Sequence, residues 1–177
     1  LKGELTPIFF GSAMTNFGVQ PFLEEFLQLA PCPGIRTSSA GDVDPESEKF
    51  TGFVFKIQAN MNPAHRDRIA FIRICSGRFS RGMEVYNACD GKTVRLSQPQ
   101  QFMAQERTIV EEAYAGDIIG VFDPGVFRIG DTLSEENREL KFEGIPTFPA
   151  EHFARVSPAD SMKRKQFLKG ITELSEE

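Results

Sequence analysis

Three short apolar runs, separated by loops rich in Gly, Pro, Asn and Ser, constrain the fold of this 177-residue chain more than any other feature. The runs span residues 51–59, 68–77 and 82–87, and each is rich in β-branched or aromatic residues. Runs of this length and composition predict consecutive strands, because a helix would show a longer stretch with a 3.6-residue period. We therefore expect a β-barrel or sandwich at the centre of the chain.

The alternation of side chains within each run predicts the faces of the strands. The first run places three large apolar side chains on one face: Phe53, Phe55 and Ile57. The second run is apolar on both faces, with Ala70, Ile72 and Ile74 on one and Ile69 and Phe71 on the other. A strand that is apolar on both faces is central or lies against a second layer.

The rest of the chain shows two changes of sequence pattern, one on each side of the predicted barrel. Further short strands are expected at 93–96, 101–104, 108–110, 117–122 and 127–129. Before the barrel, a strand at 5–10 and a helix at 18–30 resemble one βα unit. After it come a strand at 153–156 and a helix that the stretch 157–160 (SPAD) could cap. The fold class is therefore mainly β, with α/β segments at both ends. We expect a βα remnant at 1–33, a linker at 34–49, the barrel at 50–139 and the truncated start of another domain at 140–177.

The net charge of −5 argues against a general nucleic-acid binder, but the charge is unevenly distributed. Between residues 60 and 82 there are five arginines against the single carboxylate of Asp67. A local basic patch on an acidic body is typical of a docking surface. The alternative is that these arginines are solvated residues at the ends of strands, and the charge pattern alone does not choose between the two.

No motif in the chain is sufficient for catalysis. The sequence around Gly91 and Lys92 lacks the first glycine of a phosphate-binding loop and lies between two strands, so we interpret it as a hairpin turn. His65 and His152 lie far apart and have no metal-ligand spacing to a cysteine. The three cysteines are interpreted as reduced and buried or half-buried, which suits a cytoplasmic protein. No apolar run is long enough to suggest a membrane partner.

Several stretches together resemble the translational GTPases. The segments 52–60 (GFVFKIQAN) and 63–68 (PAHRDR) resemble the second domain of that family, and more closely its bacterial peptide-chain release factor three branch than elongation factor G. The same resemblance extends over 110–114 (VEEAY), 142–146 (FEGIP) and 165–170 (KQFLKG), so it covers nearly the whole chain.

The resemblance implies a function. Members of this branch bind GTP with Mg²⁺ on the ribosome and drive decoding release factors off it, in the cytoplasm. Ser12 and Ala13 would be the remnant of the motif that contacts the guanine base, and the phosphate loop and switches of the family are absent from this sequence. We therefore expect that the chain itself is not an enzyme and does not bind a cofactor or a metal.

The barrel of this family leans on the GTPase domain of the same chain and docks on small-subunit ribosomal RNA. Here the docking would fall on loops that carry Arg66, Arg68, Arg78 and Arg81, through phosphate contacts. Arg73 lies within a strand, so we expect it to be a structural pairing residue.

Two other functions stay open. The first is the equivalent portion of an elongation-type GTPase, whose parent moves tRNA. The second, from a different class, is a self-contained barrel that binds a small ligand.

Overall fold

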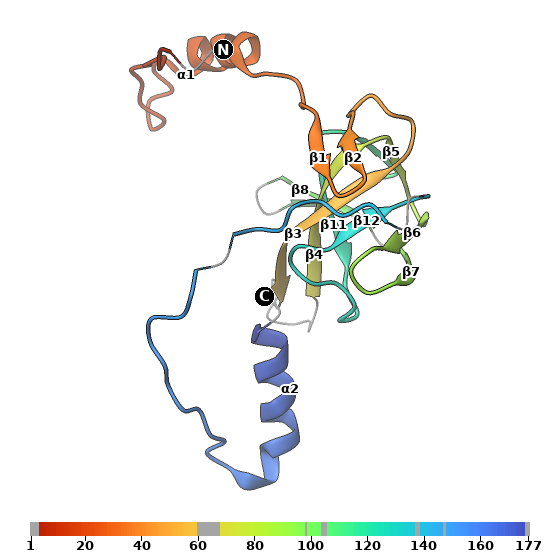
Figure 1. Cartoon of the computed structure of the whole chain (residues 1–177). Helices are drawn as coiled ribbons and strands as arrows, with labels where there is room; N and C mark the ends of the chain where they lie inside the picture. The colour runs from red at the N-terminus through yellow and green to blue at the C-terminus, as the bar shows by residue number, and fades with distance from the viewer. Residues whose placement is uncertain are drawn as a thin grey trace. The chain divides into compact units, whose positions relative to one another are not determined.

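The computed structural model describes residues 4–59, 68–97, 99–103, 106–136, 139–146 and 148–175. The chain divides into two compact units, Leu1–Gly34 and Ile35–Glu177 (Figure 1).

The first unit is built around helix α1 (Val19–Leu29), which confirms the helix predicted at 18–30. The ring of Phe22 packs edge-on against Phe9, with 5.3 Å between ring centroids, and against Phe26 at 6.0 Å. The strand predicted at 5–10 is wrong: in the described residues this segment has no strand partner. A strand needs a neighbour for its backbone groups, and the described part of the first unit forms only one bridge, between Ser12 and Phe17.

The second unit is mainly β, as predicted. Its eight-stranded sheet has the order β7-β6-β12-β3-β4-β11-β8-β9, and every neighbouring pair is antiparallel. The strands are β3 (Thr51–Ala59), β4 (Arg68–Ser76), β6 (Glu84–Asn87), β7 (Lys92–Arg95), β8 (Gln100–Met103), β9 (Glu106–Ile109), β11 (Ile118–Phe122) and β12 (Thr132–Ser134). Two further pairs join β5 (Arg78–Ser80) to β10 (Glu112–Tyr114) and β1 (Arg36–Ser38) to β2 (Gly41–Val43).

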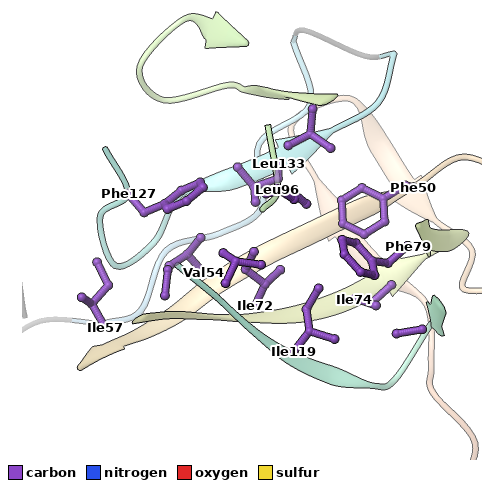
Figure 2. Packing of buried hydrophobic residues seen from close by; sticks show 14 residues of the cluster. Phe50, Val54, Ile57, Ile72, Ile74, Phe79, Leu96, Ile119, Phe127 and Leu133 are labelled. Carbon is purple, nitrogen blue, oxygen red and sulfur yellow. The ribbon is translucent and has the colours of Figure 1, made fainter. Parts of the chain in front are cut away.

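The large sheet curls around a single hydrophobic core. Beyond β7, the carbonyl of Ser97 accepts a 3.4 Å hydrogen bond from the backbone N–H of Phe122 in β11, which draws distant strands of the sheet together. Figure 2 shows the side chains that fill the space inside, with Phe50 beside Phe79 and Val54 beside Ile72. The shared face predicted for Ala70, Ile72 and Ile74 is confirmed, and it faces the core, because all three are completely buried.

The prediction that Phe53, Phe55 and Ile57 share one face of the first run is wrong. The register of β3 against β4 shifts between Val54 and Lys56, so the alternation of side chains breaks there. Val54 and Ile57 point into the core, whereas Phe53 and Phe55 are half-buried on the outer face. A β-bulge of this kind leaves no periodic signal in the sequence.

The chain after the barrel ends in a short 3-10 turn, η1 (Ser161–Lys163), and helix α2 (Arg164–Ser175). The predicted cap is confirmed, because the Asp160 carboxylate accepts a 2.9 Å hydrogen bond from the backbone N–H of Met162. The strand predicted at 153–156 does not form, and Phe153 is exposed. No helix in the described part of the chain has the length and apolar character needed to cross a membrane.

A small hairpin, β1–β2, occupies much of the range predicted as a linker. It is tied to the segment that leaves the barrel: Ser38 bridges Phe142, and the N–H of Ser39 donates to the carbonyl of Lys141 at 2.8 Å. The hydroxyl of Ser39 also donates to the carbonyl of Glu139 at 2.8 Å. The entry and exit segments of the barrel are therefore fastened to each other.

Candidate nucleic-acid interface

Two of the predicted docking arginines lie close together at the surface. Arg78 begins β5 and Arg81 follows it, and both are exposed. Each pairs with a carboxylate on or beside strand β10: Arg78 with Glu112 at 3.5 Å and Arg81 with Glu111 at 2.8 Å. Exposed ion pairs of this kind contribute only about 0–1 kcal/mol, so an RNA phosphate could replace either carboxylate at little cost.

Arg68 lies in a different environment from the one predicted. It is the first residue of β4 and is buried, not a solvated loop residue. Its Nε lies 2.9 Å from Oδ2 of the buried Asp123, and one terminal nitrogen donates to the carbonyl of Phe127 at 3.2 Å. A guanidinium held in this way fastens the start of β4 to the loop after β11, and its charge already has a partner.

The predicted basic patch is therefore not one surface in the described residues. Arg68 begins the nine-residue strand β4, and Arg78 follows the end of that strand. A strand of this length separates the two by roughly 25–30 Å. Arg66 lies outside the described residues. Proximity in the sequence made these arginines look like one patch, whereas the strand between them carries them to opposite ends.

In the first unit, Ser12 and Ala13 line a cleft of about 430 Å³ together with Phe10, Val19 and Phe22. Its loop is fixed by a 2.9 Å hydrogen bond from the N–H of Ser12 to the carbonyl of Phe17. The loop also needs Gly18, whose φ is 72°, because a Cβ there would lie 2.4 Å from the carbonyl oxygen of Phe10. Apolar walls beside a fixed backbone loop suit contact with a flat ring.

Cys75 differs from the other two cysteines. It is buried beneath the outer surface of β4, whereas Cys32 and Cys89 are exposed, which corrects the prediction that all three are buried or half-buried. Burial raises the pKa of the Cys75 thiol, and the nearby Arg36 and Arg73 only partly oppose this effect. Within the described residues, no group of three or more His, Cys, Asp or Glu side chains is placed to hold a metal ion.

The thiols should therefore differ in reactivity. We expect iodoacetamide at pH 8 to alkylate Cys32 and Cys89 at least about tenfold faster than Cys75, because only the exposed thiolate reacts and the raised pKa reduces the thiolate fraction. Mass spectrometry of peptides after timed quenching measures the three rates. Equal rates in the folded protein would contradict the burial of Cys75, and equal rates in urea serve as the control.

Comparison with known proteins assigns this architecture. Residues 49–136 match the family model described as Elongation factor G domain 2, and residues 142–177 match the one described as Class II release factor RF3, C-terminal domain. The chain belongs to the peptide chain release factor 3 family. The resemblance seen in the sequence is thereby confirmed, and the domain-2 match agrees with the mainly β fold of the second unit.

Similarity to curated members of the release factor 3 family extends over 99% of the chain. It is 68% identical to Peptide chain release factor 3 of Symbiobacterium thermophilum, 57% identical to that of Gloeobacter violaceus and 57% identical to that of Enterococcus faecalis. The chain covers 33%, 33% and 34% of these proteins, so it spans about a third of their length.

Proposed function

We propose that this chain is the ribosome-docking β-barrel portion of a GTP-dependent translation termination factor, which promotes dissociation of decoding release factors from the ribosome. The observation that carries the proposal is the order of the two family matches along one chain, a domain-2 barrel followed by a release factor 3 C-terminal segment. The second match favours a termination factor over an elongation factor, because the barrel model alone would suit either. The cytoplasm is the compartment in which such a factor would act.

The proposed docking partner is small-subunit ribosomal RNA. The exposed pair Arg78 and Arg81 supports phosphate contacts, because both guanidinium groups reach solvent and their present ion pairs are weak. Arg66 is part of the same proposal on sequence alone. For Arg68 we propose an indirect role, in which its pair with Asp123 fixes the start of β4.

The domain arrangement is also part of the proposal. Residues 1–33 would end a GTPase domain, 34–49 would connect it to the barrel at 50–139, and 140–177 would begin a third domain. Ser12 and Ala13 would contact the guanine base from the cleft in the first unit. GTP, GDP and Mg²⁺ would bind to the longer protein, whose GTPase domain would also pack against the barrel.

We expect the 177-residue chain alone to bind GTP only weakly and not to hydrolyse it. The phosphates and their Mg²⁺ supply most of the binding energy in such sites, and the sequence contains no phosphate-binding loop. Titration with fluorescent GTP tests this expectation, with fluorescent ATP as the control for base-independent binding. Micromolar or tighter binding of GTP would contradict it.

A chimera tests the proposed function directly. The corresponding third of the 68% identical relative would be replaced by this chain, and GTP-dependent dissociation of a decoding release factor from post-release ribosomes would be measured. We expect a rate within about threefold of the unaltered relative, a difference below 1 kcal/mol in activation free energy. A chimera that folds and hydrolyses GTP normally but leaves the release factor bound would overturn the proposal.

A further inference from the structure

A cleft of about 590 Å³ lies on the outer face of the barrel, and Arg68, Arg78 and Arg81 are not among the residues that line it. Its floor is formed by β3 and β4, which contribute Phe53, Arg73 and Cys75. Its two walls are the start of β1 and the exit segment after Phe142. Its volume falls within the range of about 300–1,000 Å³ typical of ligand pockets.

The two walls are chain segments that pair with each other at one isolated antiparallel bridge and do not form a longer ladder. The antiparallel bridge between Ser38 and Phe142 would, if it continued, place Arg36 opposite Gly144. In the described residues the pairing does not continue, because β1 forms a ladder only with β2. Among the described residues, no backbone hydrogen bond from residues 144–146 is found either. Two extended edges with unused N–H and C=O groups therefore border the cleft, and such edges accept an added strand.

The charges in the cleft indicate which kind of added peptide strand it would bind. Arg73 is half-buried between Phe53 and Ile118 in the strand pairing, and Arg36 lies on the adjacent wall. Within the described part of the chain neither guanidinium forms an ion pair, whereas Arg68, Arg78 and Arg81 each do. A half-buried cation without a partner anion is costly, so a carboxylate entering the cleft would be stabilised by charge-assisted hydrogen bonds.

The remaining lining groups favour a peptide over a nucleic acid. Phe53 and Phe142 meet edge-on, with 6.4 Å between ring centroids, and offer an apolar surface beside the two arginines. Glu143 stands on the rim. It would repel a polyanion that carries a charge on every nucleotide, whereas a peptide with spaced carboxylates and apolar side chains between them fits both surfaces.

We propose that this cleft binds an extended acidic peptide segment of a partner protein. The segment adds as a strand between β1 and residues 143–146, places a carboxylate on Arg73 and Arg36, and lays an apolar side chain on Phe53 and Phe142. Because the cleft borders both the entry and the exit of the barrel, the bound strand would also hold these two segments in one arrangement.

The test uses the 177-residue chain and a fluorescent, N-acetylated eight-residue peptide that repeats two glutamates followed by two valines, so that each face of the extended strand carries both carboxylates and apolar side chains. Fluorescence anisotropy should show saturable binding, and the same peptide with glutamine in place of glutamate should bind at least about tenfold more weakly. Hydrogen exchange should show new protection of the amides of residues 143–145. No saturable binding of the acidic peptide, or equal binding of the neutral one, would overturn the proposal.

Variants locate the binding site. Arg73→Gln should weaken peptide binding about tenfold, whereas Arg128→Gln, which removes an equal charge from an exposed loop, should change it by less than about twofold. Glu143→Gln alters only an exposed side chain and should strengthen binding about two- to threefold, so it tests the cleft even if Arg73→Gln does not fold. Equal effects of Arg73→Gln and Arg128→Gln, or no effect of Glu143→Gln, would overturn the site. The proposal would also be overturned if an eight-nucleotide oligouridylate displaced the peptide at a lower concentration than unlabelled peptide does, because the cleft would then be a nucleic-acid site.

Discussion

Replacing Asp123 with alanine should destabilise the barrel by about 3–5 kcal/mol, a large share of the ~5–15 kcal/mol that holds a typical domain together. The side chain is fully buried, and one of its oxygens lies 2.9 Å from Nε of Arg68. The other oxygen accepts hydrogen bonds from three successive backbone N–H groups, those of Gly125, Val126 and Phe127, at 2.8, 2.8 and 3.2 Å. Alanine would leave a buried cation, one buried backbone donor and two part-buried ones without this acceptor.

Urea unfolding of matched variants separates the two contributions. Asp123→Asn keeps an oxygen for the backbone donors and loses only the charge, so combining it with Arg68→Met should recover much of the stability that Asp123→Asn alone loses. Asp90→Ala is the control, because its ion pair with Lys92 is exposed and should contribute less than about 1 kcal/mol. If Asp123→Ala lowers the free energy of unfolding by less than about 1 kcal/mol, as expected for the exposed Asp90–Lys92 pair, this account of the loop is contradicted.

Replacing Phe79 with alanine should cost about 3–5 kcal/mol of unfolding free energy. Phe79 is the middle residue of β5, is completely buried and packs against Phe50 with 6.3 Å between ring centroids (Figure 2). Removing the ring leaves a cavity among residues that are already closely packed, and the surrounding strands can relax only partly. Thermal and urea unfolding of the second unit measure the loss.

Phe71→Ala is the matched control for Phe79→Ala. Phe71 is half-buried on the outer face of β4, beside Phe55 at 6.4 Å and with Nζ of Lys56 5.5 Å above its ring. Truncation there opens a gap that water can enter, so the loss should be clearly smaller than at Phe79. Equal losses for the two variants would mean that the core does not lie on the face of β4 that carries Ile72 and Ile74.

The contrast between Phe71 and Phe79 shows which core positions the sequence pattern does not predict. The runs at 51–59 and 68–77 were sufficient to predict strands, and the alternation within β4 correctly placed Ala70, Ile72 and Ile74 on one shared face, which the structure shows to be the core face. Phe79 gave no signal because its strand is only three residues long, too short for a period to appear. In β3, the bulge after Val54 reverses the faces without altering the composition of the run.

The candidate site was predicted less well, for a related reason. Charge can be counted along a sequence, but the surface on which it lies depends on the path of the chain. Arg68 and Arg78 flank one strand and so lie at its opposite ends, and the carboxylate that neutralises Arg68 comes from Asp123, more than fifty residues later. Arg73 was predicted to be a structural pairing residue because it lies within a strand. The cleft around it could not be anticipated, because the hairpin that forms one wall was predicted as a linker and the exit segment that forms the other was predicted as the start of another domain.

Ribosome binding by the chimera over a range of salt concentrations tests the docking proposal most directly. Each phosphate contact that is lost should reduce the slope of log affinity against log salt by about 0.7–0.9. We therefore predict that the double variant Arg78→Gln and Arg81→Gln binds small subunits with a slope shallower by about 1.4–1.8. The control is Arg128→Gln with Arg155→Gln, which removes the same charge from other exposed positions and should leave the slope unchanged. Identical slopes for wild type and the Arg78, Arg81 double variant would contradict the proposal that this end of the barrel contacts ribosomal RNA.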